Sequence, residues 1–225
     1  MHPDICRFVS DAVYEGRLGT IPETSRHRVL RNPACHPERS EGSSPGIDAE
    51  TGIVWVPVEH DGCEQKSDEE CAQIAAIVEE LLGRRVVDHD GVERDMTEND
   101  ILVVTPFNLQ VRCLREKLGP GIRIGSVDKF QGQEAPVVIV SLCSSTLEEA
   151  PRGASFLLNP NRLNVAVSRA EALAIVVGCP DLMAVRCTSV EEMRLVNLLC
   201  HLVQYAEDQG VLRGHNVTLS GAKGT

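Results

Sequence analysis

The sequence predicts an α/β protein whose parallel sheet is covered by helices on both faces. Short segments that are almost wholly apolar, at 101–104, 122–124, 137–142 and 173–177, have the composition of strands covered on both sides. Segments with helical spacing separate them, which is the alternation typical of α/β proteins. With 225 residues, of which 42% are hydrophobic, the chain is long enough to bury a sizeable core.

The amino-terminal part begins with a helix and continues with a segment of very different composition. Residues 3–14 place apolar side chains at helical spacing behind Pro3, a residue that favours the first turn of a helix. Residues 20–50 are rich in Pro, Ser, Arg and Gly, and we expect a loop or a disordered insertion there. The β-branched run 53–58 predicts a strand, and Pro57 indicates a sheet edge or a strand end.

A helix and a hairpin are expected next. Ser67 and Glu70 have the spacing of a capping box, and apolar residues follow them at helical spacing up to Leu82. Asp90 and Gly91 form a dipeptide favoured in tight hairpins. We therefore predict an amphipathic helix after the capping box and a small hairpin around the dipeptide.

The carboxyl-terminal half alternates strands with helices. We predict a helix from about 107 to 118, a second from 162 to 169 and a longer one from 190 to 207. The last helix has an apolar face that we expect to pack on the sheet, although the same face could dock a partner. For residues 208–225 we expect a flexible tail.

Charge and composition narrow the choice of partners. The net charge of −11 at first speaks against a polyanionic ligand, but residues 46–99 alone carry 15 acidic and 4 basic side chains. Elsewhere the charges nearly balance, so a nucleic-acid partner is not excluded. Aromatic residues make up 3% of the chain, too few for a platform that stacks successive bases. Any nucleic-acid contact should therefore be mainly to the backbone.

Cysteine usage and hydropathy indicate the compartment. The nine cysteines are scattered without a C-x-x-C pair or a histidine at zinc-finger spacing, so we expect reduced thiols and no structural metal. The amino terminus has no secretory signal, and no apolar run is long enough to span a membrane. We therefore expect a cytoplasmic protein with no membrane partner.

The densest polar segment is 126–134, which follows a predicted strand at the place where doubly wound sheets bind their ligands. Gly132 would let the backbone approach a phosphate, while Gln131 and Glu134 could form hydrogen bonds with a sugar or a base. Because a Gln-Gly pair taken alone is usually a turn, this interpretation needs support from elsewhere in the chain.

A second polar cluster lies on the predicted helix 162–169. Arg162 and Arg169 are seven residues apart, about two helical turns, and would point the same way. A guanidinium beside a buried strand is costly unless it meets an anion, because it cannot be deprotonated. Either a bound phosphate or a structural salt bridge would meet this need.

Taken together, the two clusters resemble motifs V and VI of superfamily 1 helicases. Residues 127–134 read V-D-K-F-Q-G-Q-E and residues 162–170 read R-L-N-V-A-V-S-R-A, and each matches that family's pattern. The segment 104–110 is similar to its T-P-[YF]-x-x-Q element, and residues 1–3 with 14–16 resemble the M-H-P and Y-x-G stretch of its second RecA-like domain. The resemblance is closest to the branch that contains the nonsense-mediated-decay helicase, the Okazaki-flap nuclease-helicase and bacterial nuclease-helicase fusions.

The resemblance implies a nucleotide site on this chain. Arg169 would be the arginine finger, placing positive charge at the γ-phosphate of ATP during phosphoryl transfer. Gly132 would donate its backbone N–H to that phosphate, and Glu134 would accept a hydrogen bond from the ribose. Gln131 and Arg162 would brace this arrangement.

It also implies partners and a shared cofactor. Thr105, Asn108 and Ser126 would contact the sugar-phosphate backbone of single-stranded DNA or RNA, which positions the strand without reading its sequence. The sequence contains no G-x-x-x-x-G-K-[ST], so ATP with Mg²⁺ would be shared with a Walker-containing first RecA-like domain.

The implied fold is a RecA-like P-loop NTPase fold, here the second helicase domain without its own P-loop, over residues 1–19 and 51–207. Two positions depart from the family pattern. The chain starts at Met1, where the family has a preceding arginine, as a truncated reading frame would. Glu171 stands where a basic residue usually follows the motif VI arginine.

Three other interpretations remain. The missing P-loop favours a non-catalytic remnant that binds nucleic acid or protein. Asp48, Glu64 and Lys66 resemble the acidic pattern of restriction-type nucleases, but they lie in polar surroundings, and we favour a solvated surface. Residues 88–91 lack the remaining positions of a calcium loop, so we expect a turn there and assign no metal ligand.

Overall fold

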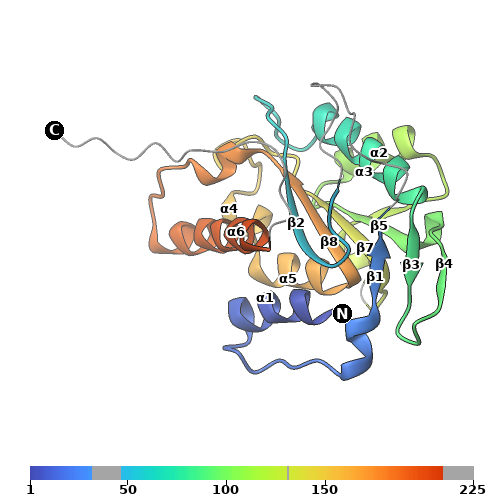
Figure 1. The fold of residues 1–225 in the computed structure, drawn as a ribbon. Helices are drawn as coiled ribbons and strands as arrows, with labels where there is room; N and C mark the ends of the chain where they lie inside the picture. The colour runs from blue at the N-terminus through green and yellow to red at the C-terminus, as the bar shows by residue number, and fades with distance from the viewer. Residues whose placement is uncertain (32–46, 131, 210–225) are drawn as a thin grey trace.

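A five-stranded parallel sheet forms the centre of the molecule (Figure 1). The computed structural model describes residues 1–31, 47–130 and 132–209. The sheet's strands, in spatial order, are β2 (Gly52–Pro57), β8 (Ala170–Gly178), β7 (Ala135–Ser141), β5 (Ile101–Val104) and β6 (Arg123–Gly125), and every neighbouring pair is parallel. This confirms the predicted α/β fold, and β2 with its Pro57 lies at a sheet edge as expected.

Helices cover both faces of the sheet (Figure 1). The α-helices are α1 (Pro3–Val13), α2 (Asp68–Leu82), α3 (Asn108–Leu118), α4 (Ala154–Leu157), α5 (Pro160–Ser168) and α6 (Val190–Asp208). Buried side chains of α2 and α3 belong to one apolar cluster, and those of α1, α4, α5 and α6 belong to the other. Consecutive residues of β7 alternate between the clusters, since Val138 packs with α5 and α6 while Ile139 packs with α2 and α3.

Short 3₁₀-helices connect several of these elements. They are η1 (Pro22–Arg26), η2 (Glu98–Asp100), η3 (Val127–Phe130) and η4 (Pro180–Met183). The last helix, α6, contacts β2 and buries Leu195, Leu199 and Leu202, which confirms that its apolar face packs on the sheet.

A small antiparallel sheet contains a strand that the sequence did not predict. It consists of β1 (Arg28–Leu30), β3 (Arg85–Val87) and β4 (Glu93–Asp95). Strands β3 and β4 form the expected hairpin. The segment 20–50 was expected to be a loop or disordered, but β1 pairs with β3 and buries Val29. Residues 32–46 of that segment lie outside the described residues.

Two further expectations concern the whole chain. Every cysteine in the described ranges is a free thiol, in agreement with the predicted reduced state. Within the part of the chain that the structure describes, no helix combines the length and apolar character that crossing a bilayer requires.

Candidate functional site

The predicted site residues lie at two opposite ends of the sheet. Thr105 follows β5 and Ser126 follows β6, so both lie where these parallel strands end. Glu134 directly precedes β7 and Arg169 directly precedes β8, at the end where those strands begin. Helix α5 connects the two ends, because Arg162 lies in its first turn and Arg169 caps its last.

Strand pairing places Glu134 and Arg169 next to each other. Ala135 pairs with Ala170 across β7 and β8, and its backbone N–H donates to the carbonyl oxygen of Arg169 at 3.1 Å. Both predicted motifs therefore end at the same point of the sheet. Gly132 is exposed near this point with a φ of +78°, and no atom lies within 4 Å of the position that a Cβ would take. Gln131 lies outside the described residues.

The side chain of Arg169 bonds to the backbone of its own helix. Its Nε donates to the carbonyl oxygen of Val165 at 3.2 Å, and the side chain is half-buried. Among the described residues it forms no ion pair. Within the described ranges, the salt-bridge interpretation thus finds no carboxylate at Arg169, and the other N–H groups of the guanidinium keep their capacity to donate to an anion.

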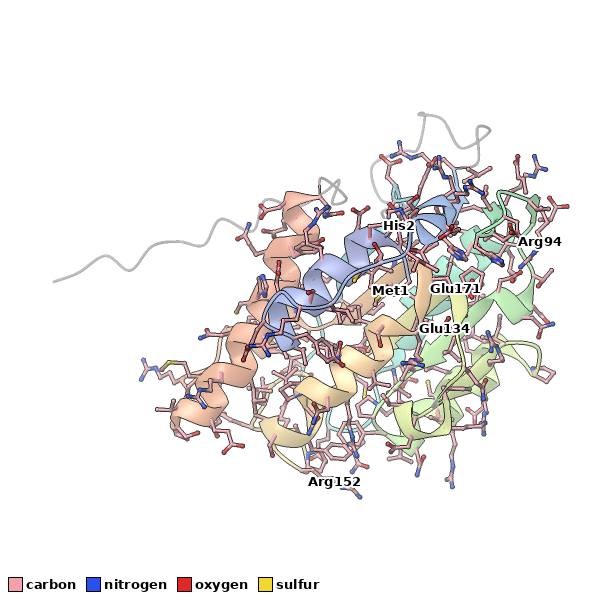
Figure 2. The ribbon with its side chains drawn as sticks, turned by 90° about the horizontal axis from the view of Figure 1, so that it is seen from below. Met1, His2, Arg94, Glu134, Arg152 and Glu171 are labelled. Carbon is pink, nitrogen blue, oxygen red and sulfur yellow. The ribbon has the colours of Figure 1, made fainter. Side chains whose placement is uncertain are left out.

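The start of the chain packs against the same end of the sheet. The backbone N–H of His2 donates to the carbonyl oxygen of Glu171 at 2.7 Å, and Figure 2 shows Met1, His2, Glu134 and Glu171 in this region. The Glu171 carboxylate lies 3.7 Å from Nδ1 of His27. Burial lowers the pKa of His27, and Glu171 opposes that effect. The acidic side chain that departs from the family pattern at Glu171 therefore lies beside a buried histidine.

A cavity of about 200 Å³ lies at the opposite end, where β5 and β6 end. Its lining includes all three predicted nucleic-acid contacts, Thr105, Asn108 and Ser126. It also includes Arg162, which the resemblance assigns to the nucleotide site. The guanidinium of Arg162 lies 3.9 Å from the carboxylate of Asp128, so a weak ion pair exists at this arginine.

The sequence analysis did not identify two of the lining residues, Arg152 and Phe156. Arg152 and Arg162 each place their guanidinium over the ring of Phe156, with the guanidinium carbons 4.6 and 4.3 Å from its centroid. The ring of Phe107 packs on Phe156 with the centroids 5.4 Å apart. Arg152 and Phe156 lie between β7 and α5, where no hydrophobic periodicity drew attention to them; an arginine four residues before a phenylalanine was the available signal.

The first turn of α3 lies beside this cavity. Pro106 and Asn108 line the cavity, and Phe107, at the N-cap position, gives the helix no side-chain cap. The first backbone N–H groups of α3 therefore keep their capacity to donate to an anion.

A buried hydrogen-bond network supports the wall of the cavity. The carboxylate of Glu70 accepts from Ser141 Oγ at 2.6 Å and from the backbone N–H of Cys143 at 2.9 Å, and it lies 3.1 Å from His60 Nε2. Burial raises the pKa of Glu70, while the bonds from His60 and Ser141 counteract this. Cys143 has a φ of +53°, and its Sγ lies 3.8 Å from Oγ1 of Thr105.

Gln110 joins this network to helix α2. Its Oε1 accepts from the backbone N–H of Ser67 at 2.9 Å, and its Nε2 donates to Ser141 Oγ at 3.0 Å. Ser67 Oγ accepts from the N–H of Glu70 at 3.0 Å, so the predicted cap is present. The second half of the predicted capping box is absent at this helix start, because Gln110 occupies the N–H of Ser67 and the Glu70 carboxylate binds β7.

The weaker acidic signals have local partners. Asp48 pairs with Arg31 at 3.1 Å and Lys66 pairs with Asp68 at 3.0 Å, so neither charge is directed at a shared nuclease centre. The carboxylate of Asp88 accepts from the N–H groups of Asp90 and Val92, both at 2.9 Å. These bonds form the turn of the β3–β4 hairpin, as predicted.

Comparison with known proteins finds a family and several relatives. Residues 1–181 match the profile of a family described as AAA domain. The DNA-binding protein SMUBP-2 of Rattus norvegicus is 30% identical over 79% of this chain and 17% of its own length. The DNA polymerase alpha-associated DNA helicase A of Saccharomyces cerevisiae is 28% identical over 79% of this chain and 26% of its own length. The probable RNA helicase armi of Drosophila melanogaster is 40% identical over 40% of this chain and 8% of its own length. The chain thus spans a small part of each of these relatives.

Proposed function

This chain belongs to the AAA domain family and is a superfamily 1 helicase-like domain, and on that premise we propose that it is the C-terminal motor domain of an ATP-dependent helicase. The observation that carries the proposal is the juxtaposition of the two motifs at the start of β7 and β8, with Arg169 unpaired among the described residues. An arginine without a described counter-charge, at the end of the sheet that the exposed Gly132 loop precedes, is suited to a phosphate.

The residues at this end of the sheet fit one half of a nucleotide site. Arg169 would donate to the γ-phosphate as negative charge redistributes during phosphoryl transfer. Gly132 is open and left-handed, so its backbone would approach the same phosphate, and the exposed Glu134 would accept from the ribose. Gln131 would brace the loop. Bound ATP with Mg²⁺ would supply the bond that is cleaved, and the phosphate-cradling loop would come from a Walker-containing first domain.

The cavity at the other end of the sheet supports the nucleic-acid half of the proposal. All three predicted residues line one cavity, where Asn108 and Ser126 offer an amide and a hydroxyl group to a sugar-phosphate backbone. Thr105 is fully buried, with its hydroxyl 3.8 Å from Cys143 Sγ, so it would shape the wall of the cavity. Helix α5 reaches from this cavity to Arg169, a distance of about 10 Å at 1.5 Å per residue. A single rigid helix would therefore connect strand binding with the nucleotide site, over the domain that we assign to residues 1–19 and 51–207.

ATP hydrolysis tests the motor proposal. The purified chain is assayed alone and mixed with a Walker-containing first domain encoded upstream, each with and without single-stranded DNA. We expect turnover only in the mixture, and a loss of about three powers of ten in Arg169→Ala. Arg194→Ala, which removes an exposed arginine on α6, serves as the control and should hydrolyse ATP like the unaltered chain.

A second candidate function is a binding module that hydrolyses nothing. The absence of G-x-x-x-x-G-K-[ST] from the sequence favours it. Retained binding of single strands with no turnover in any mixture, or turnover indifferent to Arg169, would support this alternative and contradict the motor proposal.

A further inference from the structure

We propose that the cavity where β5 and β6 end binds one backbone phosphate of a nucleic-acid strand through Arg152 and Arg162, and that Phe156 holds both guanidinium groups in place. The inference rests on the proposed function, because the occupant is the same single strand. It moves Arg162 from the nucleotide site to the nucleic-acid site, and it adds Arg152, to which neither the motifs nor the resemblance gives a role.

The charges around the cavity favour an anion. Arg152 is exposed and forms no ion pair with any described residue. Arg162 has one acidic neighbour, the Asp128 carboxylate at 3.9 Å. Because the Asp128 side chain is 80% exposed, water screens this ion pair and it is weak. Two guanidinium groups near one ring repel each other, and a phosphate bound beside them would offset that repulsion.

Phe156 determines how the two arginines are presented. Both guanidinium carbons lie within 4.6 Å of its centroid, a distance at which the cation is attracted to the ring. A guanidinium stacked in this way keeps its N–H donors at its edge, where they match the two oxygens of a phosphate. Because Phe107 also packs on this ring, we assign Phe156 to holding the arginines and not to stacking a base.

Neutral donors complete the site. Asn108 and Ser126 line the same cavity, and the uncapped first turn of α3 adds backbone N–H groups. The volume of about 200 Å³ is below the roughly 300–1,000 Å³ of a typical small-molecule pocket, so it suits one phosphate with part of its sugar. A backbone phosphate carries no sequence information, and we therefore infer binding that is independent of base identity.

Fluorescence anisotropy of labelled single strands tests this inference on the chain as it stands. The probes are oligo(dT) and oligo(dA) of equal length, each titrated over a range of salt concentrations. Arg152→Gln should bind both probes about tenfold more weakly, the loss expected for a charge-assisted contact. The slope of log K against log salt should fall by about 0.7, the value for one phosphate on a single strand.

Two further variants sharpen the result. Arg162→Gln should have the same effect as Arg152→Gln on both probes. Arg194→Gln removes the same charge from an exposed position on α6 that does not line the cavity, and it should bind like the unaltered chain. Since Arg152 is exposed, its substitution should leave the far-ultraviolet circular dichroism unchanged.

The outcomes separate this inference from the proposed function. If the unaltered chain binds both probes and Arg152→Gln binds them equally well with the same salt slope, the phosphate site is wrong and the motor proposal stands. A loss confined to one of the two probes would overturn the backbone assignment. If the unaltered chain binds neither probe, the nucleic-acid half of the proposed function fails together with this inference.

Discussion

The buried carboxylate of Glu70 lies behind the candidate site, where three groups contact it. It is fully buried and bonds to two groups at the end of β7, Ser141 and the backbone of Cys143. The left-handed conformation of Cys143 is unusual for a residue with a side chain, and a hydrogen bond to its N–H helps to hold it. Glu70 therefore stabilises the backbone that positions Thr105, without lining the cavity itself.

Glu70→Ala should lower the free energy of unfolding by about 3–5 kcal/mol, because it leaves buried donors without their acceptor. Urea denaturation followed by circular dichroism measures the loss. Glu79→Ala changes an exposed residue of the same helix and should alter the free energy by less than about 0.5 kcal/mol. Equal effects of the two substitutions would contradict the role given to Glu70.

At the start of helix α2, the local sequence pattern predicts the cap at Ser67 but not the partners of Glu70. The spacing of Ser67 and Glu70 correctly predicts the cap, because a cap depends on neighbours three residues apart. The destination of the Glu70 carboxylate depends on Ser141 and Cys143, which are distant in the chain, and no local pattern contains that information. The contact of Arg152 with Phe156 spans only four residues, but its place in the cavity depends on residues that follow β5 and β6 and are distant in the chain.

An ion pair connects the small antiparallel sheet to the central parallel sheet. Arg94 on β4 donates to both carboxylate oxygens of Asp100, at 2.7 and 2.6 Å, and Asp100 directly precedes β5. Burial alone would raise the pKa of Asp100, but the bonds from Arg94 and Thr97 lower it below its ordinary value. The ion pair therefore links a surface hairpin to a central strand.

Asp100→Asn should lower the free energy of unfolding by about 2 kcal/mol near neutral pH. Because the folded-state pKa lies below the ordinary 3.8, this stabilisation is present above that pH and is lost as pH falls through the folded-state value. The difference between the two proteins should therefore shrink in urea denaturation at about pH 3. Asp95→Asn, at a side chain that is 92% exposed, should change little at either pH. A pH-independent difference for Asp100→Asn would refute the ionic origin.

A helix or strand can be predicted from the sequence when the residues within it carry a clear pattern of their own. The strands of the large sheet are apolar on both faces, so their composition alone identified them. Strand β1 has three residues, and it is ordered by pairing with β3, which follows much later in the chain. A segment so short, within a stretch rich in polar residues, carries too little local signal to predict a strand.

For the whole molecule, the central sheet joins two apolar cores into one folding unit. Ile139 lies in the core beneath α2 and α3, and Trp55 lies in the core beneath α1 and α6. Strands β7, β8 and β2 contribute side chains to both, so loss of either core should disrupt the other.

Ile139→Ala should lower the free energy of unfolding by about 2–5 kcal/mol, since Ile139 is fully buried. Trp55 is the only tryptophan, so its fluorescence reports on the opposite core. We expect the fluorescence and circular dichroism transitions in urea to shift together. Val92→Ala, at a residue that is 57% exposed, should leave both in place. Transitions that separate would show that the two cores unfold independently.

The position of β2 in the sheet has a consequence for synthesis on the ribosome. Strand β2 ends at Pro57, but its neighbour β8 begins only at Ala170. At about 5–20 residues per second, an apolar strand therefore emerges roughly ten seconds before its pairing partner exists. During that interval its N–H and C=O groups are open to other chains, so a nascent chain that stalls before β8 would be prone to aggregate through β2.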